Sequence, residues 1–355
     1  MTAPAVAADW RRYGPELRAY LADRAKATDL GETDVRDTLR YLGERDLLGV
    51  DAGCVRTGIV DIAELIELAA GECGSSAFSF WAHRMVIEYL RDVADDSVLG
   101  QLRQRLLAGT TVGSTAMAAA LQEVAGLREV PVIATPEADG FRLAGTIRWA
   151  SNLVPGAAVV LAARVADTDA RLIAVAHIGD PGVSVAPAPK LLAMNATVSS
   201  AITLADVRVD RDHVVSEDLR GFVARVRPVL LLLQTAFCVG LATRALDEAR
   251  AGVFGTAAVL TPDIDELTAR LADVVDRSRR AQQDLSSADA REVTQLRFDV
   301  AQVAMAAARL EATIRGGMGY ATSNATNRRL REAAFLPVQS PSETQLRWEL
   351  ARSSG

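Results

Sequence analysis

The stretch Glu311–Arg347, EATIRGGMGYATSNATNRRLREAAFLPVQSPSETQLR, predicts a helix, a glycine turn, a second helix, a short loop and a third helix. In the turn, Gly316-Gly317 lacks Cβ atoms and tolerates positive φ, so the backbone can approach a ligand closely. In the loop, Ser340 suits an N-cap, Pro341 suits the first helical position, and Glu343 completes a capping box with Ser340. Such a helix start presents backbone N–H groups and a positive dipole end. The stretch therefore predicts a ligand-holding turn followed by a capped helix.

Composition, net charge and cysteine spacing indicate a globular protein and argue against nucleic-acid-binding, secreted and membrane proteins. Of 355 residues, 50% are hydrophobic and 24% are charged, which is ordinary globular composition. A net charge of -6 argues against a nucleic-acid surface, which needs clustered Lys and Arg. The N-terminus does not read as a signal peptide, and the strongest apolar run, around Pro228–Leu233, is far below membrane-spanning length. Cys54, Cys73 and Cys238 lie far apart, which fits a reducing compartment. We expect a soluble, cytoplasmic protein without nucleic-acid or membrane partners.

The hydrophobic period changes twice along the chain, which predicts three domains. Residues 1–109 repeat at three and four positions, as helices do, and Ser76–Val93 is apolar on most sides. Residues 110–218 contain alternating segments such as Phe141–Ser151, a strand signature. Residues 219–355 return to the helical period. The predicted class is α+β: an N-terminal helical domain, a central antiparallel β-barrel or sandwich, and a C-terminal four-helix bundle.

Most familiar catalytic motifs are missing from the sequence. Gly317-Met318-Gly319 fails as a dinucleotide fingerprint, because Thr322 takes the third glycine position and a helix precedes it. The histidines, His83, His177 and His213, lack metal-ligand spacing, so we expect no metal site. The side chains alone offer little chemistry, which favours an organic cofactor.

The α–β–α order and four local stretches resemble the acyl-CoA dehydrogenase family, over essentially the whole chain. Leu143–Asn152, LAGTIRWASN, is similar to the family's "NG-K-W-I-T-N" strand. Lys190–Val209 is similar to the segment ending "F-E-D-V-x-V-P", and Val226–Arg250 to the helix reading "R-P-V…GLA…ALDEA". Thr313–Arg347 resembles "Q-I-L-G-G-x-G-[FY]…R-D-A…Y-E-G-T…I-Q-R".

The resemblance implies FAD as the cofactor and assigns residues to it. Trp149 is expected to pack on the isoalloxazine and Ser151 to hydrogen-bond its N5 edge. The backbone of Met117 and Ala118 is expected to meet the pyrimidine edge, and Gly316-Gly317 to face the FAD of a neighbouring subunit. The implied cofactor-binding set is Met117, Ala118, Trp149, Ser151, Gly316, Gly317 and Ser342, with His83 and Ser340 in the substrate pocket. A homodimer or homotetramer is implied as well.

The departures from the family's pattern concern the reaction. The catalytic glutamate of "Y-E-G-T" falls on Ser340, and a serine cannot remove the α-proton of a thioester unaided. Glu343 is the alternative base, but the capping box gives its carboxylate a structural partner. Family members that carry the base on the first bundle helix are no guide, because Phe222–Arg227 has no acid. The arginine of "R-x-x-F-G" aligns with Ala251, one residue after Arg250.

Three functions are compatible with this sequence. The chain can be an FAD-dependent acyl-thioester dehydrogenase with a relocated base. It can be a flavin-dependent monooxygenase on the same fold, a reaction that tolerates the missing glutamate. It can also be a base-deficient subunit of a heteromeric acyl-CoA dehydrogenase, in which a related chain supplies the base.

Overall fold

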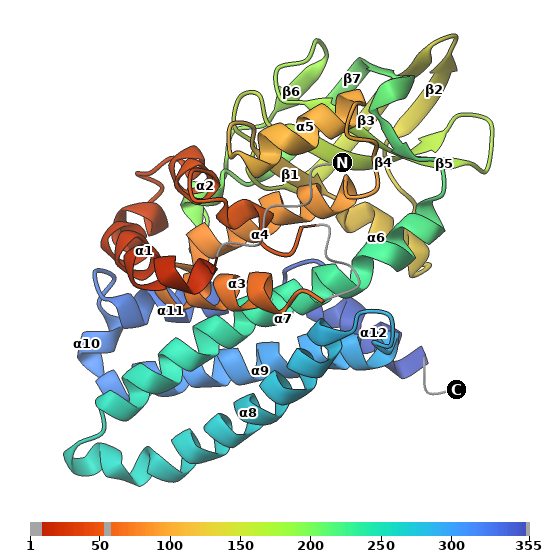
Figure 1. Ribbon diagram of the computed structural model, residues 1–355. Coiled ribbons are helices and arrows are strands. Elements are labelled where there is room, and N and C mark those ends of the chain that lie inside the picture. The colour runs from red at the N-terminus through yellow and green to blue at the C-terminus, as the bar shows by residue number, and fades with distance from the viewer. Residues whose placement is uncertain (1–8, 53–57, 353–355) are drawn as a thin grey trace.

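The computed structural model describes residues 9–52 and 58–352, and its N-terminal part is helical, as predicted (Figure 1). All sixteen residues of α4 are buried, which explains why its sequence is apolar on most sides. The helices are α1 (Gly14–Asp29), α2 (Val35–Gly43), α3 (Val60–Glu72), α4 (Gly74–Tyr89) and α5 (Val98–Leu107).

The central part is one eight-stranded sheet in the order β6-β7-β3-β2-β4-β5-β8, with β1 paired to β4. Most pairs are antiparallel, as predicted, but β1 and β2 both run parallel to β4. The short helix α6 (Ala118–Val124) between β1 and β2 allows this, and the sequence pattern did not predict it. The strands are β1 (Gly113–Ala116), β2 (Ile133–Glu137), β3 (Gly140–Ala150), β4 (Ala158–Val165), β5 (Arg171–His177), β6 (Val183–Val185), β7 (Ser200–Asp210) and β8 (Val214–Ser216).

The C-terminal part is a helical bundle built around one long helix, α7, which Figure 1 shows crossing the molecule beneath the sheet. By length and composition α7 could span a membrane, but 89% of its most apolar window is buried, so it is the core helix of the fold. Cys238 on α7 and Cys73 at the start of α4 are buried thiols, and Cys54 lies outside the described residues. The helices are α7 (Leu219–Ala251), α8 (Thr261–Gln283), α9 (Ala290–Arg315), α10 (Gly317–Tyr320), α11 (Ala325–Ala333) and α12 (Glu343–Arg352).

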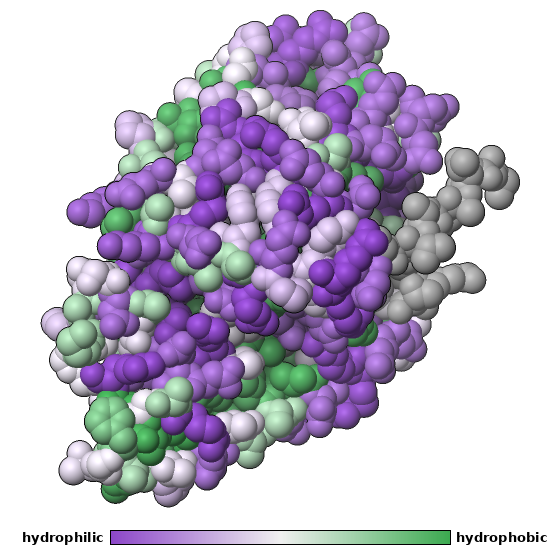
Figure 2. Space-filling view, turned by 60° about the vertical axis from the view of Figure 1, so that its left-hand side comes forward, coloured by the Kyte–Doolittle hydropathy of each residue, from purple (hydrophilic) through white to green (hydrophobic). Residues whose placement is uncertain are grey.

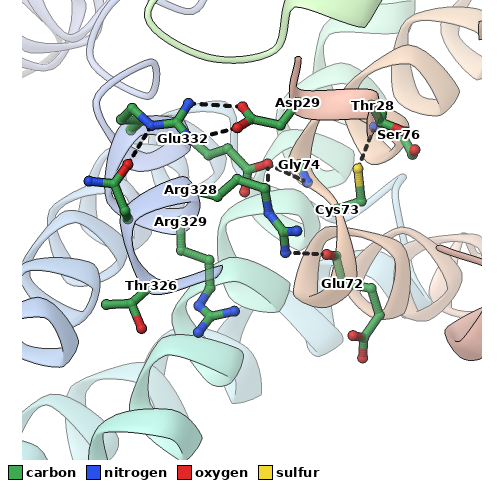
Figure 3. A network of polar contacts seen from close by, with 12 residues as sticks. Thr28, Asp29, Glu72, Cys73, Gly74, Ser76, Thr326, Arg328, Arg329 and Glu332 are labelled. Carbon is green, nitrogen blue, oxygen red and sulfur yellow. Dashed lines mark hydrogen bonds and ion pairs between the residues drawn. The ribbon is translucent and has the colours of Figure 1, made fainter. Parts of the chain in front are cut away.

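A polar network joins the two helical parts (Figure 3). From α11, the Arg331 guanidinium binds both carboxylate oxygens of Asp29 at the end of α1, with one contact at 2.9 Å. The neighbouring Glu332 accepts a hydrogen bond of 3.1 Å from the backbone N–H of Gly74, the first residue of α4. Arg331 and Glu332, which take the place of the first two residues of the family's "R-D-A", thus hold the bundle against the N-terminal helices.

Burial makes Glu332 a source of pH-dependent stability. Desolvation raises its pKa to about 6 from 4.5, although Arg328 opposes the shift. The folded protein therefore holds this proton more tightly than the unfolded chain does, and stability falls as pH rises from about 4.5 to about 6. We expect Glu332→Gln, which still accepts from Gly74, to match wild type near pH 4.5 and to be more stable by about 2 kcal/mol at pH 7.5. Urea unfolding of both proteins across this range measures the difference, and parallel stability curves would contradict the assignment.

Candidate active site

The predicted cofactor residues fall into two groups. Met117 and Ala118 follow β1, and Trp149 and Ser151 lie at the end of β3. The two strands meet where the hydroxyl of Ser114 donates a 2.6 Å hydrogen bond to the carbonyl of Ser151. The two segments that carry these four predicted residues therefore come together where β1 meets the end of β3.

Trp149 points outward because of a β-bulge. Ile147 pairs with Ile202, but Ala150 pairs with Ser200, so β3 has one extra residue between these positions. Strict alternation predicts Trp149 on the buried face with Ile147, whereas its side chain is 57% exposed. A bulge of this kind re-aims a side chain and is common beside binding sites. Trp149 thus offers an open aromatic face.

Asn152 anchors the end of β3 and was not singled out as a functional residue from the sequence. It is fully buried with φ of 62°, a conformation that asparagine tolerates better than most residues. Its amide nitrogen donates to the carbonyls of Ser79 on α4 (2.9 Å) and Gly113 on β1 (3.1 Å), and its backbone N–H donates to Thr197. Asn152 fixes the position of Ser151 beside it.

His83, expected in the substrate pocket, is fully buried in α4. Its Nδ1 accepts from the backbone N–H of Gly113 at 2.9 Å, so Nε2 carries the proton and donates to the carbonyl of Leu106, also at 2.9 Å. Burial lowers the pKa of His83 to about 4, which keeps the ring neutral. With both nitrogens bonded to backbone, His83 joins α4 to β1 and α5 and presents no free group to a substrate.

The loop before α12 differs from its predicted cap. α12 begins at Glu343, and the hydroxyl of Ser342 accepts from the backbone N–H of Gln345 at 3.3 Å, so Ser342 is the N-cap. The prediction of Ser340 as N-cap and Pro341 as first helical residue is wrong. An N-cap carbonyl accepts the first helical hydrogen bond, but the carbonyl of Ser340 accepts instead from Gln234 on α7, at 2.8 Å.

The capping box between Glu343 and Ser340 is likewise absent. The Glu343 carboxylate accepts from Gln302 at 3.0 Å and from Arg347 at 2.8 Å. The hydroxyl of Ser340 is buried and has no hydrogen-bond partner among the described residues. The one acid of this loop is therefore held by α9 and α12 rather than directed to Ser340.

A buried arginine lies behind the loop. Arg297 on α9 is fully buried and donates to Gln234 at 3.0 Å, to Gln339 at 3.0 Å and to the carbonyl of Leu336 at 3.2 Å. Because Gln234 also holds Ser340, one network ties α7, α9 and the loop together. The surroundings of Ser340 thus contain amides and a guanidinium, which cannot act as a general base at neutral pH.

Aromatic side chains fill the neighbouring space. Phe78 on α4 lies 5.0 Å from Phe335, 5.3 Å from Trp81 and 6.5 Å from Phe237 on α7, measured between ring centroids. Phe335 is five residues before Ser340. This cluster lies between α4, which carries His83, and the segment that leads to Ser340, the two residues expected in the substrate pocket.

Gly316-Gly317 lies at the opposite end of α9, about five turns and 28 Å from Arg297. Gly316 has φ of 57°, and a Cβ added at either glycine meets no atom within 4 Å. Arg315 pairs with Glu248 at 2.6 Å, which places the turn beside the end of α7. The turn therefore faces open space at the end of the bundle, away from Trp149 of the same chain.

Large apolar side chains are exposed around this end of the bundle, and we call them the bundle-end patch: Phe254, Val259, Met318 and Tyr320, each 71 to 81% exposed. Figure 2 shows hydrophobic surface gathered at the lower end of the molecule. Arg250, the arginine next to the position that matches the one in "R-x-x-F-G", donates to Asp265 at 2.9 Å on the surface. Exposed apolar groups of this size mark interaction surfaces.

The residues at the end of β3 fit a flavin ring, whereas those around the Gly316-Gly317 turn fit a flavin cofactor only partly. An exposed indole, the nearby hydroxyl of Ser151 and the backbone N–H of Ala118, which has no partner within its helix at the first position of α6, suit a flat heteroaromatic ring. At the far end, the open Gly316-Gly317 turn allows close approach of a ligand, but Arg250 is engaged with Asp265. Among the described residues, no group of three or more His, Cys, Asp or Glu is arranged to hold a metal ion.

Among known proteins, only solved structures are similar to this chain. No protein-family model matches the sequence, and no curated protein matches it. Solved structures match along the whole chain. A probable acyl-CoA dehydrogenase from Mycobacterium abscessus has a TM-score of 0.85 at 19% identity, covering 100% of both chains. Butyryl-CoA dehydrogenase from Megasphaera elsdenii has a TM-score of 0.83 at 15% identity, covering 99% of each.

The prolyl acyl carrier protein oxidase AnaB is similar to the same degree, with a TM-score of 0.83 at 16% identity, covering 99% of this chain and 100% of its own. Identities this low establish the fold rather than the activity. The α–β–α architecture predicted from the sequence is confirmed, and the chain has the fold of the acyl-CoA dehydrogenases.

Proposed function

We propose that this chain is an FAD-binding subunit of an oxidoreductase that acts on acyl thioesters, and that another chain supplies the general base. The fold and the open face of Trp149 support the flavin part of this proposal. The thioester carrier is coenzyme A or an acyl carrier protein, since similar structures include a butyryl-CoA dehydrogenase and a carrier-protein oxidase.

One observation supports the proposal that another chain supplies the base. The position that matches the family's base holds Ser340, whose surroundings are neutral and cationic groups. Oxidation between the α and β carbons of a thioester needs an acceptor for the α-proton. Glu343 is held by Gln302 and Arg347, and the nearest titratable group of the network is the guanidinium of Arg297. The chain's own loop therefore offers no proton acceptor for this step.

Each group of residues has a separate task in this proposal. Bound flavin supplies the hydride acceptor. Trp149 binds one face of the ring, the backbone after β1 orients its edge, and Ser342 keeps the start of α12 in place. The bundle-end patch and the open Gly316-Gly317 turn are the surface that a partner covers, bringing its own flavin contacts with it.

Anaerobic flavin reduction tests the proposal. We expect FAD bound to this chain alone to keep its visible absorbance when a panel of acyl-CoA and acyl-carrier-protein thioesters is added. Addition of a related chain with glutamate at the position matching Ser340 is expected to allow thioester-dependent bleaching. Replacing that glutamate with glutamine in the partner is the matched control and should remove the bleaching.

Two results would contradict the proposal. Bleaching by a thioester with this chain alone would show that it contains its own base. Rapid NADH-linked oxygen consumption with free reduced flavin, without any thioester, would point to the monooxygenase alternative.

A further inference from the structure

Three hydroxyl groups form a chain that begins at the candidate flavin face. The hydroxyl oxygens of Ser151 and Ser199 are 2.7 Å apart, and those of Ser199 and Thr197 are also 2.7 Å apart. Thr197 in turn donates to the backbone carbonyl of Met194 at 2.8 Å. The chain therefore ends on a group that can only accept a hydrogen bond.

This end point fixes the direction of every bond in the chain. The single hydroxyl proton of Thr197 goes to Met194, so the contact between Thr197 and Ser199 must use the proton of Ser199. The contact between Ser199 and Ser151 must then use the proton of Ser151. Ser151 has no proton left to donate, and its free lone pairs make it an acceptor only.

The surrounding fold holds this arrangement in place. Thr197 is buried, and its backbone carbonyl accepts from the N–H of the fully buried Asn152, next to Ser151. Trp149 and Ser151 flank the buried Ala150 at the end of β3, and neither of them is itself buried. A ligand that reaches Ser151, two residues from Trp149, meets an oxygen that can accept a hydrogen bond but cannot donate one.

We propose that Ser199 and Thr197 are positioning residues that commit Ser151 to accept, and that they thereby favour the reduced form of the bound flavin. This inference rests on the proposed function. The resemblance assigns Ser151 to the N5 edge of the flavin, and this edge would offer an acceptor in the oxidised form and an N–H donor in the reduced form. With the flavin bound in this way, an acceptor-only Ser151 would pair with the reduced form and would oppose the oxidised form. The hydroxyl chain thus raises the reduction potential of the flavin.

The midpoint potential of the bound flavin tests this inference. In Ser199→Ala, Ser151 regains a free proton and can donate to oxidised N5, so the oxidised form gains. We expect its reduced-to-oxidised ratio to fall about tenfold at fixed potential, a shift of about 30 mV for a two-electron couple. Thr197→Val is expected to shift the potential in the same direction, because Ser199 loses its acceptor. Thr197→Ser keeps the hydroxyl and should retain the wild-type potential.

A double-mutant comparison shows whether Ser199 acts through Ser151. In a Ser151→Ala background, adding Ser199→Ala is expected to leave the potential unchanged. If the Thr197 variants do not fold, the half-buried Ser199 and Ser151 variants still decide the question. Potentials equal to wild type in Ser199→Ala, with flavin bound, would overturn this inference alone. Failure of wild type to bind flavin, alone or with a partner, would overturn the proposed function as well.

Discussion

Trp149→Ala is expected to lower the affinity for FAD roughly tenfold to hundredfold while leaving the fold intact. An aromatic stack contributes about 0.5–1.5 kcal/mol beyond area burial, and covering the exposed indole adds the hydrophobic gain of its apolar surface. Little packing within the chain is lost, because the side chain is 57% exposed. Titration of the apoprotein with FAD, followed by the change in flavin fluorescence, measures the affinity.

The matched controls separate stacking from a general surface effect. Trp149→Phe keeps a flat ring and should retain most of the affinity. Leu192→Ala removes an exposed apolar side chain, 65% accessible, and should leave FAD binding unchanged. Equal affinity of wild type and Trp149→Ala would show that the flavin does not lie on this indole.

The sequence predicts the order and class of the elements well, because long periodic segments carry a strong signal. It predicts the direction of single side chains less well, and β3 shows why. The alternation of Phe141, Leu143, Ile147 and Trp149 is real, and the first three are buried. One extra residue in the pairing with β7 then turns Trp149 outward. A bulge depends on the register of two strands about fifty residues apart, which a local pattern does not contain.

The loop before α12 shows a second limit. Its residues satisfy the pattern of a capping box. However, the side chain of Gln234 donates to the carbonyl of Ser340, and the helix starts at Glu343 instead of Pro341. Gln234 lies on α7, over a hundred residues away. Local chemistry allows either Ser340 or Ser342 as the N-cap, and a tertiary hydrogen bond decides which of them the chain uses.

The third limit concerns residues whose role comes only from their neighbours. The sequence assigns no role to Asn152, Thr197 or Ser199, and each acquires its importance from a hydrogen bond to a residue far away in the chain. The sequence shows that Ser340 stands where the family has its glutamate. It does not show that amide and guanidinium groups surround Ser340.

Arg297→Ala is expected to lower the free energy of unfolding by at least about 3 kcal/mol, the largest loss of stability that we predict for a single substitution in this chain. It leaves three buried acceptors, on Gln234, Gln339 and Leu336, without their donor, and each unsatisfied buried group costs about 1–3 kcal/mol. A cavity the size of the lost side chain adds to the cost. Urea unfolding followed by circular dichroism measures the difference.

The opposing effect is the desolvation of the guanidinium, which has only neutral partners and is itself costly to bury. Arg297→Met removes this cost while filling most of the volume, so it should lose less stability than Arg297→Ala. Arg347→Ala breaks an exposed pair with Glu343 and should cost less than about 1 kcal/mol. If Arg297→Met were as stable as wild type, the three hydrogen bonds would only balance the desolvation. The arginine would then add nothing to stability, and its contribution would lie in holding the loop of Ser340 against α7.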